Sequence, residues 1–179
     1  MGTTEKDTAR IIVEHVGLPV TVDAFLVDQS ERLKTLLPTV KLMPGAERLI
    51  KHLHQNKIPI AIATSSSQPA YDLKASNYKA LFALFHHIVA GGTDPEVKHG
   101  KPAPDIFLVC ASRFPGKPPP DKVLVLEDAP NGVQAAVAAG MQVVMVPDPK
   151  LPADRKKGAT IIINSLMDFK PEMFGLPRF

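Results

Sequence analysis

The chain lacks several features that would mark a disulfide-rich, membrane or nucleic-acid-binding protein. Its 179 residues contain a single cysteine, Cys110, which excludes an internal disulfide. Cys110 lies in an apolar helical pattern, which favours a core residue over a nucleophile. No apolar run is long enough to span a membrane, and the net charge of +3 comes from scattered Lys and Arg residues. We therefore expect neither a membrane nor a nucleic acid among the partners.

The first ten residues, MGTTEKDTAR, also lack the apolar stretch of a signal peptide. The pattern for N-myristoylation is missing too, because Lys6 stands where Ser or Thr is required. We therefore expect a cytoplasmic protein.

The composition is that of an ordinary soluble domain, with 45% hydrophobic and 22% charged residues. Apolar residues at helical spacing predict two amphipathic helices, over 7–16 and about 21–36, with no strand near them. Pro38 closes the second helix. We interpret residues 1–38 as a helical piece that is distinct from residues 39–179.

From residue 39 onward, helices and strands alternate, and this alternation favours a parallel sheet. Helices are expected from Pro44, after Ser67, after the stretch GKPAPD and from Pro130. The expected strands are residues 58–63, 87–90, 123–126, 142–146 and 160–163. The predicted fold class is therefore α/β, with a Rossmann-like, doubly wound parallel sheet.

The stretch Lys122–Gly140 is the centre of this arrangement. Its apolar strand ends in two adjacent acids, Glu127 and Asp128, just before a helix. Ligands bind at the carboxyl edge of open α/β sheets, and Mg²⁺ commonly takes one or two carboxylates together with water and phosphate. An acidic helix cap is the alternative for the pair taken alone.

Two other sites at or near strand ends offer complementary chemistry. Thr64 and Ser65 supply a hydroxyl and backbone N–H groups suited to a phosphate oxygen, although Ser and Thr are also common helix caps. Lys101 lies in GKPAPD, where Pro102 and Pro104 would stiffen the backbone and aim its ammonium group at an anion. A solvated turn lysine is the alternative. A hydroxyl, a lysine and an acidic pair on successive βα units together predict phosphoryl transfer.

These stretches resemble a known family. ATSSS, GKPAPDIF and VLVLEDAPNGVQAA are similar to the second, third and fourth motifs of the haloacid dehalogenase-like (HAD-like) hydrolases, and the resemblance covers nearly the whole chain. LMPGAE and FGLPRF resemble the pseudouridine-5′-phosphatase branch. The resemblance implies a HAD-like core with a helical cap, of which residues 1–38 would be a remainder. It also implies Mg²⁺-dependent hydrolysis of a small phosphorylated metabolite, such as pseudouridine 5′-phosphate, through an aspartyl-phosphate.

The resemblance also implies a role for each candidate residue. Thr64 would bind the phosphoryl oxygen with help from the Ser65 backbone. Lys101 would bridge the phosphate and the nucleophile, so Lys101 and Thr64 are the catalytic candidates. Asp128 would ligate Mg²⁺, and Glu127 would ligate it or hold a bound water.

The first motif of the family, Asp-x-Asp-Gly on the central strand, is missing from this sequence. No Asp has a second Asp two positions later, and the nearest stretch, Asp94-Pro95-Glu96, has no Gly after it. Because that motif supplies the nucleophile and the acid/base, we expect turnover by this chain to be lost or nearly lost. A truncated, inactive isoform or a pseudoenzyme with a binding or regulatory role is the alternative function. A phospho-receiver module is disfavoured, because the acids there precede the lysine.

The missing strand should also affect the sheet. In this family it lies between the strands that end at Thr64 and Asp128, so two apolar inner edges would be unpaired. Either the edges close up, or they stay apart, or a partner strand fills the gap. We expect a marginally stable chain that can self-associate through these edges.

Overall fold

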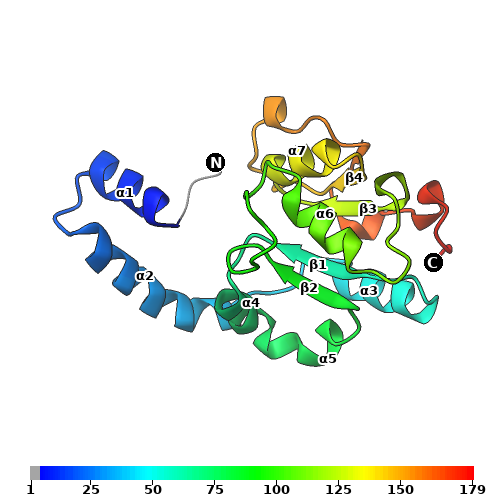
Figure 1. Ribbon diagram of the computed structural model, residues 1–179, viewed down its shortest axis with the longest axis horizontal. Helices are drawn as coiled ribbons and strands as arrows, with labels where there is room; N and C mark the ends of the chain where they lie inside the picture. Colours follow the sequence, from blue (N-terminus) through cyan, green and yellow to red (C-terminus); the bar gives the residue numbers. More distant parts are fainter. Residues whose placement is uncertain (1–4) are drawn as a thin grey trace.

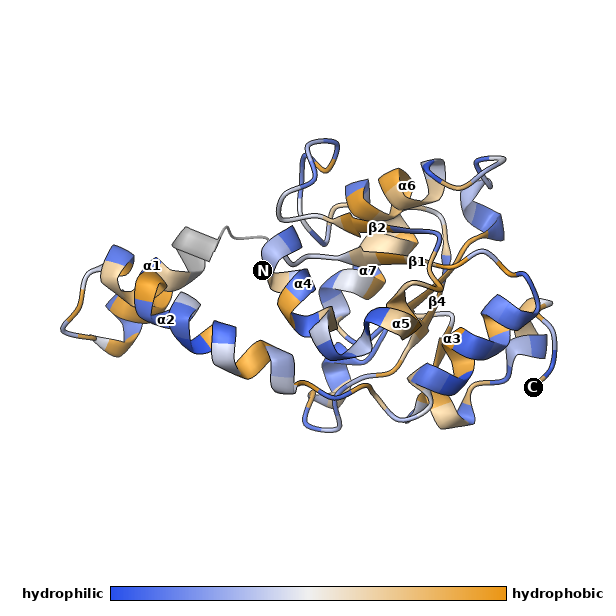
Figure 2. Ribbon diagram, turned by 90° about the horizontal axis from the view of Figure 1, so that it is seen from below, coloured by the Kyte–Doolittle hydropathy of each residue, from blue (hydrophilic) through white to orange (hydrophobic). Residues whose placement is uncertain are grey.

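The computed structural model describes residues 5–179, with side chains from Ala9 onward. The first two helices, α1 (Glu5–Val16) and α2 (Val22–Leu36), lie side by side and extend away from the rest of the molecule (Figures 1 and 2). The Thr21 hydroxyl caps α2 by accepting from the Ala24 N–H at 3.2 Å. No residue of α2 is buried.

The remaining chain forms two parallel sheets. One sheet pairs β1 (Ala61–Thr64) with β2 (His87–Ala90), and the other has the order β3 (Leu124–Glu127), β4 (Gln142–Met145) and β5 (Ile161–Ile162). Every pairing is parallel. The predicted α/β class is therefore confirmed. Within residues 5–179 no strand pairing joins β1 to β3, so the two inner edges remain apart.

The helices cover both faces of these sheets. They are α3 (Ala46–Gln55), α4 (Gln68–Ala75), α5 (Lys79–Phe82), α6 (Asp105–Ser112) and α7 (Pro130–Ala138). Short 3-10 turns occupy Leu37–Thr39, Ser76–Tyr78, Pro120–Lys122, Ala153–Arg155, Leu166–Asp168 and Pro171–Phe174. Within the described residues, no helix has both the length and the apolar character of a membrane span.

Two apolar clusters give the molecule its three layers. Val143 and Met145 point from β4 into a cluster with Val133 of α7 and residues of α6. Val144, between them, points to the opposite face and packs with Leu49 of α3, as the two-residue period of a strand requires. Because β4 is covered on both faces, Val143, Val144 and Met145 are fully buried.

The strand boundaries differ from the predicted ones at β1. The apolar run predicts a strand from Ile58, but the ladder begins at Ala61, which pairs with His87. Lys57 has a φ of 58°, and the Ile58 N–H bonds back to the Leu53 carbonyl at 2.9 Å. Ile58 therefore belongs to the turn that closes α3. The predicted last strand is likewise reduced to Ile161–Ile162, the residues that β4 pairs.

Candidate active site

Lys101 connects the carboxyl ends of the two sheets. Its ammonium group donates to the carboxylate of Glu127, at the end of β3, and to the carbonyl of Ala63 in β1 at 3.3 Å. The Lys101 and Glu127 side chains are only 12% and 9% exposed. The Lys101 nitrogen also lies 4.7 Å from the centre of the Phe107 ring, close enough for a cation–π contact. Lys101 is therefore a fixed group here, and the solvated turn lysine is excluded.

Gly132 makes room for the Glu127 carboxyl group. It lies in the first turn of α7, and a Cβ atom at this position would overlap the carboxyl atoms of Glu127. The carboxylate thus lies against the N-terminal turn of a helix, where negative charge is favoured. Gly132 is absent from the residues predicted from sequence. Its only signal in the sequence was a glycine inside a helical pattern, which does not by itself indicate a close approach.

Thr64 ends β1 beside this ion pair. Its hydroxyl oxygen accepts from the Ser66 N–H at 3.2 Å, and its carbonyl accepts from the Gly91 N–H at 2.8 Å. The following helix, α4, begins only at Gln68, with Ser67 in the N-cap position. Thr64 and Ser65 are therefore not the cap of this helix, and the exposed Ser65 lies in the turn between strand and helix.

The loop that carries Lys101 is anchored by Arg113, at the end of α6. The guanidinium donates to Asp94 at 2.6 and 2.9 Å and to Glu96 at 2.6 and 3.2 Å. The hydrogen bonds from Arg113 hold the pKa of Asp94 below its ordinary value. The stretch Asp94-Pro95-Glu96 thus has a structural role in this loop. Arg113 is a second residue that the sequence did not single out.

Asp105 closes the same loop from the other side. Its carboxylate accepts from the backbone N–H groups of Lys98 and His99 at 3.1 and 2.9 Å, and from the His99 ring at 3.2 Å. These bonds lower the pKa of Asp105. The contacts of Arg113 and Asp105 therefore fix both ends of the loop around Lys101. The Lys101–Pro102 peptide bond is cis.

Asp128 is the second acid of the predicted metal pair. It is exposed beside Glu127, and its carboxylate has no hydrogen-bond or ion-pair partner among residues 5–179. Two adjacent carboxylates at an open edge match the donor set of Mg²⁺, which completes its shell with water and phosphate. Within the described residues no three His, Cys, Asp or Glu side chains gather into a closed metal site. The residues therefore fit a hard, partly hydrated cation better than zinc.

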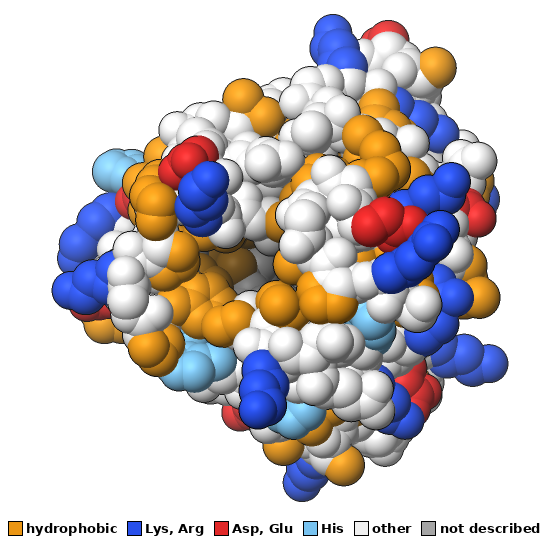
Figure 3. Space-filling view, turned by 90° about the vertical axis from the view of Figure 1, so that its right-hand side faces the viewer, with side chains coloured by type: hydrophobic (Ala, Val, Ile, Leu, Met, Phe, Trp, Pro, Cys, Tyr) orange, Lys and Arg blue, Asp and Glu red, His pale blue; other side chains and the backbone are white. Residues whose placement is uncertain are grey.

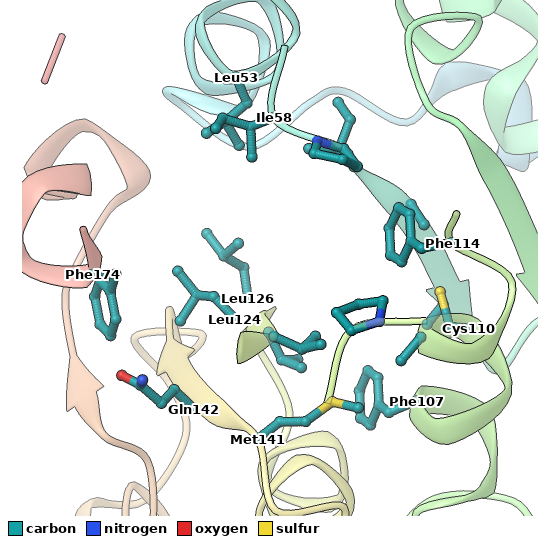
Figure 4. A pocket seen from close by; sticks show the side chains of 18 of the residues that line it. Leu53, Ile58, Phe107, Cys110, Phe114, Leu124, Leu126, Met141, Gln142 and Phe174 are labelled. Carbon is teal, nitrogen blue, oxygen red and sulfur yellow. The ribbon is translucent and has the colours of Figure 1, made fainter. Parts of the chain in front are cut away.

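A groove separates β1 from β3 and leads to the Lys101–Glu127 pair. This inter-sheet groove has a volume of about 770 Å³ and is lined mainly by apolar side chains. Figure 3 shows it as a hollow bordered by hydrophobic atoms, and Figure 4 shows Leu124, Leu126, Phe107 and Phe114 around the open space. A closely packed protein interior does not contain voids of this size.

Cys110 lies at the edge of the groove but is not a reactive thiol. It is buried, its sulfur lies 3.5 Å from the His87 ring nitrogen, and burial raises the pKa of its thiol to about 11. A thiol with a raised pKa is a poor nucleophile at neutral pH. The prediction of a core cysteine is confirmed.

Comparison with known proteins places these observations in a family. The sequence model of haloacid dehalogenase-like hydrolases matches residues 8–140. A probable pseudouridine-5′-phosphatase of Drosophila melanogaster is 51% identical over 179 residues, which is 100% of this chain and 78% of the relative. The (DL)-glycerol-3-phosphatase 2 of Arabidopsis thaliana is 54% identical over 182 residues, or 100% of this chain and 75% of the relative.

The fold is similar to that of a solved crystal structure. CbbY from Rhodobacter sphaeroides, crystallised in complex with phosphate, aligns with a TM-score of 0.76 at 24% identity, covering 93% of this chain and 75% of that one. At this identity the likeness shows the fold alone.

Proposed function

Because this chain belongs to the haloacid dehalogenase-like hydrolases and has phosphatases among its relatives, we propose that its site serves Mg²⁺-dependent hydrolysis of a small phosphomonoester. Pseudouridine 5′-phosphate is the first substrate to test, followed by similar nucleotide and sugar phosphates and by glycerol 3-phosphate. A cytoplasmic location and a cap role for residues 1–38, above a core of residues 39–179, belong to the same proposal.

The observation that carries this proposal is the position of the Lys101 ammonium group between the carboxyl ends of β1 and β3. Of its three N–H bonds, two are directed at Ala63 and Glu127, so the third can meet a phosphate oxygen. The Thr64 oxygen accepts from Ser66, which leaves its own hydroxyl proton free to donate. The Ser65 N–H would add a further donor at the same edge.

Asp128 and Glu127 would hold the metal. Asp128 is exposed and would bond it directly, whereas Glu127, already paired with Lys101, would hold a bound water. When bound, Mg²⁺ would neutralise charge on the phosphate oxygens. Gly132 keeps Glu127 in place for this task, because any larger side chain would displace its carboxyl group.

The aspartyl-phosphate step needs a carboxylate that this sequence does not supply in the expected motif. Asp94, in the nearest similar stretch, is bound to Arg113. We therefore propose the nucleophilic step for a complete form that carries Asp-x-Asp-Gly. For this chain we propose phosphate and metal binding with little or no turnover.

Calorimetric titration of the 179-residue chain with pseudouridine 5′-phosphate and with glycerol 3-phosphate, each with and without Mg²⁺, tests the binding site. We expect Mg²⁺-enhanced binding that is weakened about tenfold or more by Lys101→Met or Asp128→Asn, since each removes a charge-assisted contact. Lys98→Met, an exposed lysine of the same loop, is the matched control and should bind like the wild type. Equal binding by all variants would refute the site.

Phosphate release from the same substrates tests the nucleophile. We expect none above background. Mg²⁺-dependent release that Asp128→Asn abolishes would mean that another carboxylate attacks the phosphorus, contrary to our interpretation. Binding without release would favour the alternative of a binding or regulatory product.

A further inference from the structure

His86 and His87 are adjacent in the sequence, yet their imidazole rings meet. Their Nδ1 atoms lie 2.9 Å apart, and the two rings are nearly perpendicular, with their centres 5.2 Å apart. Neighbouring residues of an extended strand normally point to opposite faces. Because β2 begins only at His87, the side chain of His86 lies outside the strand and turns back toward its neighbour. The candidate active site does not use this pair of converging ring nitrogens.

The ring of His87 is held by α6. Its Nε2 atom lies 2.8 Å from the Cys110 carbonyl. A carbonyl oxygen can only accept, so Nε2 carries the proton and Nδ1 of the neutral ring has an unprotonated lone pair. Burial lowers the pKa of His87, which favours this neutral ring. The Phe114 ring packs edge-on against His87, with the ring centres 4.7 Å apart. The lone pair on Nδ1 is therefore held in a fixed direction, toward His86.

His86 supplies the second nitrogen from an exposed ring on a fixed backbone. Its N–H donates to the Ile60 carbonyl at 2.8 Å, and the residue is exposed to solvent. Because Nδ1 of His87 is the acceptor, Nδ1 of His86 carries the proton of the hydrogen bond between the rings. Movement of this proton to Nε2 through solvent gives the other neutral tautomer of His86. Two lone pairs then lie side by side, with no net loss of a proton.

The separation of the two nitrogens matches that of neighbouring ligands on one metal ion. Imidazole nitrogens bind metal ions at about 2.0–2.1 Å, so two of them at a right angle are about 2.9 Å apart. Two ligands of a tetrahedral ion with the same bond length would be about 3.3 Å apart. Ni²⁺ and Cu²⁺ prefer right angles with nitrogen ligands, whereas Zn²⁺ prefers the tetrahedral arrangement. The observed distance of 2.9 Å therefore favours Ni²⁺ or Cu²⁺.

The surroundings of the pair also suit a bound cation. A metal-binding histidine commonly donates its other ring N–H to a backbone carbonyl, which fixes the ring, and His87 does so with Cys110. The Arg113 guanidinium is near, but its charge is balanced by Asp94 and Glu96. Among the described residues, no third His, Cys, Asp or Glu side chain joins the pair. Water would therefore fill the other coordination positions from the exposed side.

The pair lies at the opposite end of β1 and β2 from the candidate active site. His87 is opposite Ala61 in the ladder, whereas Thr64 stands at the other end of β1. Three residue steps separate these ends, a distance of about 10 Å along a strand. An ion held by the two histidines would therefore be distinct from the proposed Mg²⁺ at the carboxylates.

We propose that His86 and His87 form a binding site for one divalent, late first-row transition-metal ion, Ni²⁺ or Cu²⁺, which both Nδ1 atoms hold and water completes. Both rings keep a proton on Nε2, so the ion replaces only the hydrogen bond between them. The bound ion would join the start of β2 to α6 through the hydrogen bond from His87 to Cys110. This inference rests on the geometry of the pair and not on the proposed function.

Calorimetric titration of the untagged 179-residue chain with Ni²⁺ tests the site. We expect saturable binding of one ion per chain. His86→Gln should weaken this binding about tenfold or more, because one of the two nitrogen ligands is lost. His54→Gln, which changes another exposed histidine, is the matched control and should bind Ni²⁺ within about twofold of the wild type. Zn²⁺ should bind the wild type more weakly than Ni²⁺, because the spacing of the nitrogens does not suit a tetrahedral ion.

Nitrogen-15 NMR of the histidine rings locates the ion. Without metal, His87 should show the tautomer protonated on Nε2. Addition of paramagnetic Ni²⁺ should broaden the ring signals of His86 and His87 before those of His54. Circular dichroism checks that each variant is folded. The test relies on His86→Gln, because the ring of His86 is exposed, whereas a substitution of His87 would also remove the hydrogen bond to Cys110.

Three outcomes would overturn the proposal. Ni²⁺ binding that His86→Gln leaves unchanged would place the ion elsewhere on the chain. Absence of saturable binding would mean that the two rings make only a hydrogen bond with each other. Tighter binding of Zn²⁺ than of Ni²⁺ would mean that the nitrogens do not impose a right angle on the ion.

Discussion

Glu127 is held by two contacts that oppose any change in its position. Lys101 pairs with its carboxylate on one side, and Gly132 lies against it on the other. Both side chains of the ion pair are nearly buried, and removing one partner of such a pair leaves an uncompensated charge. The geometry of the candidate site is therefore coupled to the stability of the strand end that carries it.

Gly132→Ala should destabilise the protein, although alanine normally favours a helix. The new methyl group would overlap the Glu127 carboxyl group and force it from its place, and overpacking of this kind costs about 1–3 kcal/mol. Urea denaturation gives the change in the free energy of unfolding. Gly100→Ala is the control, because a Cβ there meets no atom within 4 Å, and it should change stability by less than about 0.5 kcal/mol. Equal effects of the two substitutions would contradict the close approach.

The ion pair between Asp94 and Arg113 should make stability depend on pH. Arg113 lowers the folded-state pKa of Asp94 below its ordinary value of 3.8. A lowered folded-state pKa gives stability that is complete above the unfolded-state pKa and is lost as the pH falls through the folded-state value. Asp94→Asn should therefore cost about 1–2 kcal/mol at pH 7, and the difference from the wild type should shrink below about pH 4.

Urea denaturation at several pH values between about 3 and 7 measures this difference. Asp121→Asn is the control, because Asp121 is 69% exposed and lies 3.7 Å from Lys122, so its removal should change little at any pH. A difference for Asp94→Asn that persists unchanged in acid would show that the carboxylate charge is not its source.

The sequence identified some residues of the site and missed others for a physical reason. Lys101, Glu127 and Thr64 follow from local signals, because strand ends and a proline-framed loop can be located from nearby residues. Arg113 and Gly132 act through contacts with side chains that only the folded chain brings near. A basic residue at a helix end and a glycine in a helical pattern have ordinary local explanations, so nothing nearby marks them.

At the scale of elements, strand limits depend on partners that the sequence does not display. The predicted β2, residues 87–90, is confirmed without change. The apolar run before Thr64 is longer than the strand, because β2 offers partners only from Ala61 onward. Similarly, α4 begins later than a cap at Thr64 would require. The order of helices and strands can thus be predicted from nearby residues. The residues at which each element ends depend on contacts with other elements.

The helical pair α1 and α2 should open more readily than the sheets. No residue of α2 is buried, and Val16, Val20 and Val27 are 64%, 46% and 64% exposed. Elements with few buried contacts exchange their amide hydrogens by local opening. Hydrogen–deuterium exchange with mass spectrometry should therefore show fast exchange across Val22–Leu36 and slow exchange across β4. Comparable protection of both would contradict the exposed geometry.

The inter-sheet groove lies at the centre of the molecule, where an α/β domain is normally packed. A groove of about 770 Å³ divides the sheet between β1 and β3. The folded protein therefore lacks the stabilisation that backbone pairing and apolar burial would provide there. Each exposed edge also offers a template for association between copies. We therefore expect the isolated chain to unfold with a thermal midpoint below about 45 °C, beneath the usual range for mesophilic domains.

Differential scanning calorimetry at several protein concentrations measures this midpoint, because association would make it rise with concentration. A high midpoint that protein concentration does not change would require that β1 and β3 close onto each other in solution. A low midpoint that rises with protein concentration would instead assign the weakness to the two unpaired edges, because association between copies would then cover them.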